Sequence, residues 1–304
     1  MSSVTSAEDM YSVINEASRL VGVPCSRDNI WPVLTAYGDV FTEAGIAFSV
    51  STGESLPEEL DYTITVPVAF GDLYATALSN GLIAETGHPI DTLLSDIQAR
   101  VPIAEYLIDA GVVAGFNKIY ANFPFNFQRV SKLAEIPSMP TTLAQNAKLF
   151  ERHHLSEVAM IGIDYRRKTF NLYFAGLTDE YREERNILSL HREIGLPEPN
   201  ERWLEFAKKS FRFYATLSWD SPKVERICFA HTPTRDWDPS VLPVRIAPEI
   251  EKFIKGSPHA YGGQPVVITA AKWGTGGGYL NLGPYCQLSP LMRNILEQLT
   301  GTKL

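Results

Sequence analysis

Phe211-Arg-Phe-Tyr-Ala-Thr-Leu-Ser218 alternates apolar and polar side chains along its whole length. An alternation with a period of two predicts a β-strand whose two faces differ in polarity. The turn-forming segment 220–222, Asp-Ser-Pro, follows, and a second strand-like run begins at Val224. This stretch therefore predicts a β-hairpin whose first strand has one apolar and one polar face.

The same pattern recurs as five predicted hairpins, spaced by roughly 50 to 60 residues, which is typical of one repeated supersecondary unit. Strands joined as hairpins pair antiparallel, and a flat sheet of ten strands would leave exposed edges. Closing the sheet on itself removes those edges, so a barrel is favoured over an open sheet. The five pairs are Ile46–Ser51 with Asp61–Phe70, Ala104–Val113 with Phe116–Phe123, Val158–Ile163 with Thr169–Phe174, Ser210–Trp219 with Val224–Phe229, and Val266–Trp273 with Tyr279–Gln287.

Runs with helical periodicity separate the hairpins, and Ser6 with Asp9 forms a capping-box signature before the first of them. Such helices must pack outside a barrel. We therefore expect one α+β domain over residues 1–304, a ten-stranded antiparallel β-barrel surrounded by helices. The predicted helices are Glu8–Leu20, a stripe from Ile30 to Phe41, Tyr74–Leu82, Ile90–Arg100, Ala144–Arg152, Asp179–Ile194, Glu201–Lys208 and Pro290–Leu299.

Composition excludes several classes of protein. Hydrophobic residues make up 45% of the 304, as in a globular protein with a sizeable core, and the formal charge is −8. No basic run suits nucleic-acid binding, and no apolar run suits a signal peptide or a membrane span, so we expect a cytoplasmic protein with neither partner. The three cysteines and six histidines show no metal-site spacing.

The polar strand faces carry the functional signal. Because helices must cover the outside of the barrel, the apolar faces should point outward and the polar faces into the lumen. The lumen would then hold Asp61, Lys118, Arg212, Arg226 and several tyrosines. Cations bind an anionic group such as a diphosphate, and tyrosine π-faces stabilise a carbocation. The two requirements meet in prenyl transfer, which needs no dedicated catalytic base because the released proton can leave to diphosphate or water.

Three alternatives stay open on pattern alone. Lys118 or Arg226 could be a solvated cation on an ordinary half-exposed sheet. The barrel could carry a hydrophobic aromatic ligand without catalysis. It could also hydrolyse phosphate esters, although the chain shows no matching nucleophile or paired metal site. The run Gly274–Gly278 lacks the lysine of a phosphate loop and is interpreted as a hairpin turn.

Several separated segments, in order along the chain, resemble the soluble bacterial aromatic prenyltransferases of the ABBA family, the NphB and CloQ group. The similarity runs from about Val13 to the last predicted helix and is greatest to the naphthol- or phenazine-prenylating members. It implies a barrel of repeated helix-strand-strand-helix units with the reaction inside. The segments are Glu59-Leu-Asp-Tyr-Thr-Ile-Thr-Val-Pro67, Gly71-Asp-Leu-Tyr-Ala-Thr76, Thr86-Gly-His-Pro-Ile-Asp91, Ile136-Pro-Ser-Met-Pro140, Asn171-Leu-Tyr-Phe174 and Lys209-Ser-Phe211.

The resemblance also implies site residues. Tyr120, Tyr173 and Tyr214 would shield the allylic cation. Asp61 would contact Mg²⁺ if the ion is used. The diphosphate would be held by Lys118, Thr169, Asn171, Tyr214 and Arg226, and the aromatic acceptor would contact Ala47, Thr63, Phe125, Met160, Phe211, Arg212, Gly283 and Tyr285.

Two positions depart from the family pattern. Asn281 stands where a magnesium-dependent relative has a lysine, but Lys272 on the preceding strand would lie almost opposite and supply an ammonium there. We therefore expect that no cofactor is required and that Mg²⁺ is helpful at most. Arg212 replaces a small hydroxyl residue, which favours an acceptor with an acidic group. The expected donor is dimethylallyl diphosphate, with geranyl diphosphate as the alternative, and the chain is expected to act as a monomer.

Overall fold

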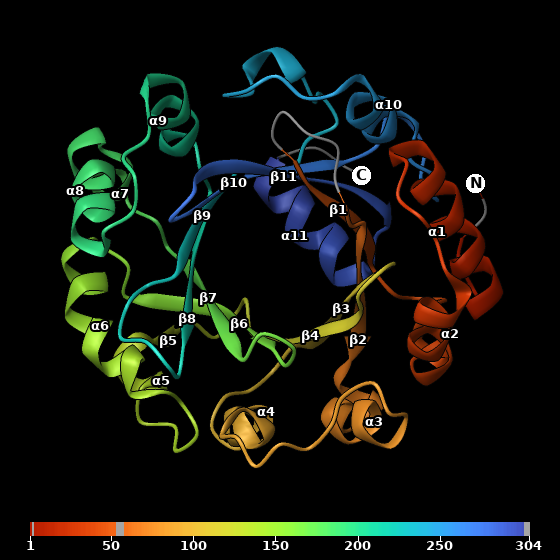
Figure 1. The fold of residues 1–304 in the computed structure, drawn as a ribbon, viewed down its shortest axis with the longest axis horizontal. Coiled ribbons are helices and arrows are strands. Elements are labelled where there is room, and N and C mark those ends of the chain that lie inside the picture. Colours follow the sequence, from red (N-terminus) through yellow and green to blue (C-terminus); the bar gives the residue numbers. More distant parts are fainter. Residues whose placement is uncertain (2, 53–57, 301–304) are drawn as a thin grey trace.

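The computed structural model describes residues 1, 3–52 and 58–300, and its centre is a closed antiparallel barrel (Figure 1). Ten strands follow one another around the ring in the order β4-β3-β2-β1-β11-β10-β9-β8-β7-β6, and pairing of β6 with β4 closes it. The expected ten-stranded barrel is confirmed. The ring strands are β1 Ile46–Thr52, β2 Asp61–Pro67, β3 Glu105–Gly111, β4 Gly115–Asn122, β6 Glu157–Asp164, β7 Thr169–Ala175, β8 Arg212–Ser218, β9 Arg226–Ala230, β10 Val267–Gly274 and β11 Gly277–Gln287.

Helices surround the barrel, and one of them, α11, lies in the middle of the ring when the molecule is viewed as in Figure 1. Side chains of α11 line the barrel cavity, so this helix covers one end of it. No helix in the described part of the chain is long and apolar enough to cross a bilayer. The helices are α1 Ala7–Val21, α2 Arg27–Ala36, α3 Leu73–Ser79, α4 Ile90–Gln98, α5 Val130–Leu133, α6 Thr141–Arg152, α7 Asp179–Arg182, α8 Glu184–Ile194, α9 Glu201–Lys208, α10 Pro248–Gly256 and α11 Pro290–Thr300.

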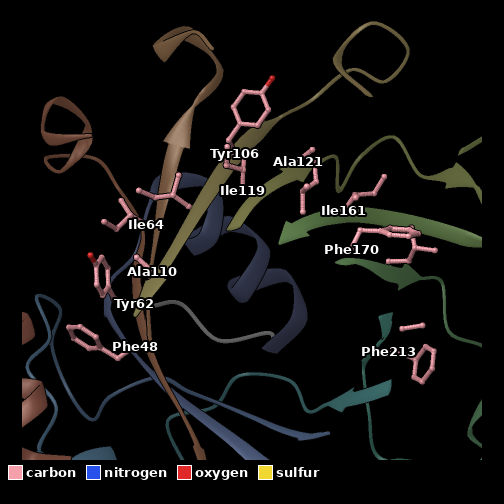
Figure 2. Packing of buried hydrophobic residues seen from close by; sticks show 14 of the residues in the cluster. Phe48, Tyr62, Ile64, Tyr106, Ala110, Ile119, Ala121, Ile161, Phe170 and Phe213 are labelled. Atoms are coloured by element: carbon pink, nitrogen blue, oxygen red, sulfur yellow. The ribbon is translucent and has the colours of Figure 1, made fainter. Parts of the chain in front are cut away.

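The hydrophobic core lies between the outer face of the barrel and the helices. Phe48, Tyr62, Ile64, Phe170 and Phe213 are at most 1% exposed, and Figure 2 shows them on the outer side of the strands, away from α11. Alternate residues of the same strands point inward. The predicted arrangement, with apolar faces outward and polar faces in the lumen, is therefore confirmed.

Local hydrogen bonds explain where the first helix begins. Ser6 Oγ accepts from the backbone N–H of Asp9 at 3.1 Å, as the capping signature predicts. The Asp9 carboxylate turns to Thr5 instead of Ser6, accepting from the Thr5 backbone and hydroxyl. The helix ends at Gly22, whose φ of 77° is the left-handed conformation that glycine adopts without strain.

Four details differ from the sequence prediction. The predicted helix Asp179–Ile194 is two helices, because Glu183 is extended at φ −63° and ψ 137°. The strand from Asp61 ends at Pro67, and a 3₁₀ turn over Val68–Phe70 leaves Val68 44% exposed rather than packed under helices. The short helix α5 and the short strand β5, which spans Gln128–Arg129, were not predicted. Strict alternation from Tyr279 along this strand would place Gln287 in the lumen. Its side chain instead donates to the carbonyls of Phe41 and Ala44, because a bulge shifts the register at Ile46 and Ala47.

Candidate active site

A cavity of about 280 Å³ lies inside the barrel, and each of the ten ring strands contributes at least one inward side chain to it. A second, more polar cavity of about 470 Å³ adjoins it. Asp61, Lys118, Arg226 and Lys272 line both cavities and therefore stand at their boundary. The alternation of the strands places these charged residues on the lumen side, opposite the hydrophobic core.

Three cations from separate strands form one end of the site. Lys118 Nζ on β4 lies 3.7 Å from Asp109 Oδ1 and 3.7 Å from Asp164 Oδ2. Burial alone would lower the pKa of Lys118, but Asp109 and Asp164 outweigh it and hold that pKa above its usual value. Arg226 Nε on β9 is buried with no hydrogen-bond partner among the described residues. This end can therefore accept an anion.

Lys272 on β10 is the third cation, and Asn281 holds it in place. Lys272 Nζ donates to Asn281 Oδ1 at 2.8 Å, and Ser51 Oγ donates to the same oxygen at 3.0 Å. Burial, Arg226 and Lys118 lower the pKa of Lys272 to about 8. A lowered pKa at a lysine beside other cations indicates positive charge that an anionic ligand would compensate. The expected closeness of Lys272 and Asn281 is confirmed.

Asp61 on β2 is a carboxylate whose charge is unfavourable in this site. Burial and the neighbouring Asp109 raise the pKa of Asp61 to about 7, although Lys118 and Lys272 oppose the shift. Asp109 itself accepts a 3.3 Å hydrogen bond from Thr63 Oγ1 through Oδ2, while its Oδ1 has no hydrogen-bond partner among the described residues. The two carboxylates therefore repel each other, and a bound proton or an additional cation would reduce that repulsion.

Three tyrosines form an aromatic wall beside the cations. The rings of Tyr173 and Tyr214 have centroids 4.6 Å apart, and those of Tyr120 and Tyr173 are 6.0 Å apart. Burial raises the pKa of Tyr173 and of Tyr214, so the phenols stay neutral and present their π-faces. The structure thus brings together the three tyrosines that the sequence selected, at a position suited to an allylic cation.

The far end of the cavity is less polar and is covered by α11. Met292, Ile295 and Leu299 of this helix line the cavity there. Arg212 is half-buried among these groups, with Cζ 5.1 Å from the Phe211 ring centroid and no carboxylate partner among the described residues. Six of the predicted acceptor-contacting residues line the cavity, namely Ala47, Thr63, Met160, Phe211, Arg212 and Tyr285. Asn171 and Asn281, predicted on the diphosphate side, also line it.

Three predicted site residues do not line either cavity. Phe125 lies beyond the end of β4 and is 69% exposed, while its neighbour Pro124 lines the cavity. Thr169 is buried at the start of β7. A Cβ on Gly283 would come within 2.5 Å of the Phe48 carbonyl oxygen, so the glycine lets β1 approach β11 closely and does not offer a contact surface.

Several residues that line the cavity were not predicted from the sequence. Glu105, Leu107 and Asp109 alternate on β3 with the buried outward residues Tyr106, Ile108 and Ala110. The signal was present, because the same alternation that selected Lys118 and Tyr120 on β4 applies to β3. The α11 residues carried no such signal, since helical periodicity does not reveal which surface a helix covers.

Comparisons with known proteins identify the family of this chain. The sequence matches the family described as aromatic prenyltransferase Orf2 over residues 5–288. The 5,10-dihydrophenazine-1-carboxylate 9-dimethylallyltransferase of Streptomyces anulatus is 43% identical over 279 residues, which cover 90% of this chain and 92% of the relative. The flaviolin linalyltransferase of Streptomyces virginiae is 40% identical over 289 residues, covering 94% of each chain.

A solved structure shows the same fold. The crystal structure of 6-dimethylallyltryptophan synthase from Micromonospora olivasterospora, in complex with DMASPP and Trp, superimposes with a TM-score of 0.56. The match covers 92% of this chain and 97% of that one, at 10% sequence identity. From the family match and the two relatives at 40% identity or more, we conclude that the chain belongs to the aromatic prenyltransferase Orf2 family and is an aromatic prenyltransferase.

Proposed function

We propose that the enzyme transfers a dimethylallyl group from its diphosphate to a small, electron-rich aromatic that carries an acidic group. The observation that carries this proposal is the division of one cavity into two cationic ends. Lys118, Arg226 and Lys272 form one end, and Arg212 forms the other, with the tyrosine wall between them. Each end fits one anion, the diphosphate of the donor or the acid of the acceptor.

In the proposed reaction, each of these groups has a role. As the carbon–oxygen bond of the allylic diphosphate breaks, negative charge develops on the leaving group and positive charge on the allyl. Preorganised cations stabilise the leaving diphosphate, and the π-faces of Tyr120, Tyr173 and Tyr214 stabilise the allyl cation. The acceptor ring, held close and in line, then attacks the allyl carbon. Loss of the ring proton at the attacked carbon to diphosphate or water restores aromaticity, which makes this an electrophilic aromatic substitution.

The relatives support the choice of substrates. One is named for dimethylallyl transfer to a dihydrophenazine carboxylate, and another for linalyl transfer to flaviolin. A phenazine carboxylate would present an anion to Arg212. The first of these names supports dimethylallyl as the prenyl group, and geranyl is the alternative.

We further propose that Mg²⁺ assists the reaction without being required. Asp61 offers one half-buried carboxylate beside the cations, and Mg²⁺ typically uses one or two carboxylates plus substrate phosphates. Within the described residues, no group of three or more His, Cys, Asp or Glu side chains could hold a metal. A bound ion would neutralise diphosphate charge at Asp61, where Lys272 already supplies an ammonium.

We infer that the enzyme acts as a monomer. All ten strands of the closed ring and the covering helix α11 come from one chain, so the described cavity is complete without a partner. Gel filtration with light scattering tests this directly, and a dimer at assay concentration would contradict it.

The test of the function is incubation with dimethylallyl diphosphate and a panel of acceptors, read by mass spectrometry. The panel holds a reduced phenazine carboxylate, a hydroxynaphthoic acid and an uncharged dihydroxynaphthalene. Prenylated product, formed faster from the acidic acceptors, supports the proposal. Acceptor binding without product would indicate a carrier barrel, and phosphate release without prenylated product would indicate a hydrolase.

A further inference from the structure

A buried carboxylate lies in the cavity wall, far along the strands from the diphosphate end. Glu105 is the first residue of β3, is 8% exposed and lines the cavity. Asn122 Nδ2 donates to Glu105 Oε1 at 3.1 Å. No lysine or arginine among the described residues forms an ion pair with Glu105. The carboxylate is therefore buried with an uncharged partner and no cation.

If Glu105 and Asn122 formed only a structural hydrogen bond, the negative charge of Glu105 would not be needed. A carboxylate can accept about four hydrogen bonds, so the one from Asn122 leaves most of that capacity unused. Burial raises the pKa of Glu105 to about 6, and the bond from Asn122 opposes the shift. A glutamine would pair with Asn122 without any cost of burying charge. The ionisable group in this wall is better explained by a ligand that donates to it.

The position of Glu105 complements that of Arg212. Going round the ring from β3 through β4, β6 and β7 to β8, the two side chains are four strands apart out of ten, on nearly opposite walls. Glu105 is four residues along β3 from Asp109, which contacts Lys118, and Arg212 is four residues along β8 from Thr216, which pairs with Arg226. Four residues of strand span about 13 Å, so both groups lie well away from the diphosphate end.

We propose that Glu105 binds the aromatic acceptor by accepting a hydrogen bond from an N–H or O–H group conjugated with the attacking ring. This inference rests on the proposed function. When the ring attacks the allyl carbon, positive charge spreads to the conjugated nitrogen or oxygen. The hydrogen bond to the carboxylate then strengthens, so Glu105 stabilises the transition state more than the bound acceptor.

Together, Glu105 and Arg212 define an acceptor class. The acceptor is a fused aromatic with an acidic group on one side, for Arg212, and an N–H or O–H donor on the other, for Glu105. A hydroxynaphthoic acid whose hydroxyl and carboxyl groups lie on opposite edges of the ring system, such as 6-hydroxy-2-naphthoic acid, has both groups. Its O-methyl ether lacks only the donor, and its methyl ester lacks only the charge.

The test compares wild type with Glu105→Gln on the hydroxynaphthoic acid and on its O-methyl ether. The glutamine keeps an oxygen for Asn122 and removes the charge. Because hydrogen bonds to charged groups are about twice as strong as neutral ones, we expect kcat/KM on the free acceptor to fall about 10-fold or more. The rate on the ether should change little, and KM for dimethylallyl diphosphate should stay the same. Glu157→Gln on β6, which lines neither cavity, is the matched control and should leave both rates unchanged.

The outcomes separate this inference from the proposed function. If wild type prenylates none of the acceptors, the proposed function fails. If wild type prenylates the free acceptor and Glu105→Gln lowers both acceptor rates equally or neither, the role of Glu105 fails alone. Circular dichroism and acceptor binding followed by tyrosine and tryptophan fluorescence show whether the variant is folded. A folded variant that binds the free acid and the ether as wild type does, with unchanged kcat, would also overturn the inference.

Discussion

Lys272 Nζ donates to Asn281 Oδ1 at 2.8 Å across the β10–β11 hairpin. The strand register places Asn281 opposite Ala270, one inward step from Lys272, so the long lysine side chain reaches diagonally to the amide. The amide thereby directs an ammonium to the side of the lumen where Asp61 and Lys118 lie. β10 therefore adds an ammonium, beside Asn281, to the cations that β4 and β9 supply at this end of the cavity.

Activity should survive removal of metal. We expect wild type to retain most of its product formation in EDTA, with modest stimulation by Mg²⁺, because three protein cations line the end of the cavity that is proposed to bind the diphosphate. In Lys272→Gln, turnover should fall and the stimulation by Mg²⁺ should grow, since the ion then replaces a lost charge. Lys223→Gln, on the exposed turn before β9, is the control. Complete loss of wild-type activity in EDTA, restored by Mg²⁺, would make Asp61 an obligatory metal ligand.

Arg226→Ala should lose about 100-fold or more in kcat, by analogy with removal of one preorganised donor from a transition state. The fold should persist, because the side chain lies in the lumen and outside the apolar core. Steady-state kinetics with thermal unfolding checks both statements. A kcat close to that of wild type would show that Arg226 does not contribute to the proposed diphosphate site.

Lys118→Ala should lose activity to a similar extent and also lose stability. Lys118 bridges Asp109 and Asp164, so its removal leaves two buried carboxylates without their cation. The melting temperature of Lys118→Ala should therefore fall below that of Arg226→Ala at pH 8. Equal melting temperatures of the two variants would contradict an additional contribution of this ion-pair cluster to stability.

Arg212→Ser should change acceptor preference more than overall rate. A guanidinium without a carboxylate partner among the described residues favours an acidic ligand. We expect kcat/KM to fall about 10-fold on the hydroxynaphthoic acid and to change little on its methyl ester, since a charge-assisted hydrogen bond is lost only with the acid. An unchanged ratio between the two acceptors would contradict the assignment.

Asp61→Asn should stabilise the ligand-free enzyme above neutral pH. Because the folded pKa of Asp61 is raised to about 7, the folded state holds more protons than the unfolded state between the two pKa values. The free energy of unfolding of wild type therefore falls as pH rises through that window. The asparagine of the variant does not ionise, so its free energy of unfolding does not fall in this way. We expect a gain of about 1 to 2 kcal/mol at pH 8 and none at pH 4, allowing for solvent screening. Melting temperatures at the two pH values give the answer, and a variant less stable than wild type at pH 8 would contradict the prediction.

The alternation of polar and apolar residues was sufficient to predict the barrel, its inside and outside, and most of the site. Lys118, Tyr120, Asn171 and Tyr173 face the cavity because strand geometry leaves them no other direction. The prediction fails beyond the ends of the strands, where the alternation of side-chain directions no longer applies. Phe125 lies past the end of its strand, and its ring is free to point outward.

Other misses have different causes. Gly283 has the expected place on its strand, but the approach of Phe48 decides its role, and that contact joins residues far apart in the sequence. The break at Glu183 interrupts no apolar stripe, so periodicity continues across it. The position of α11 over the cavity depends on tertiary packing alone, so the sequence pattern could not predict it.

The placement of the hydrophobic core outside the barrel separates folding from catalysis within each strand. Alternate residues belong either to the packing with the helices or to the lumen, and apart from the ion-paired cluster at Lys118 the two sets share few contacts. Substitution of an uncharged lumen residue can then alter which aromatic is bound while the folding equilibrium stays nearly constant. At such positions a change of substrate can therefore be selected with little effect on the stability of the protein.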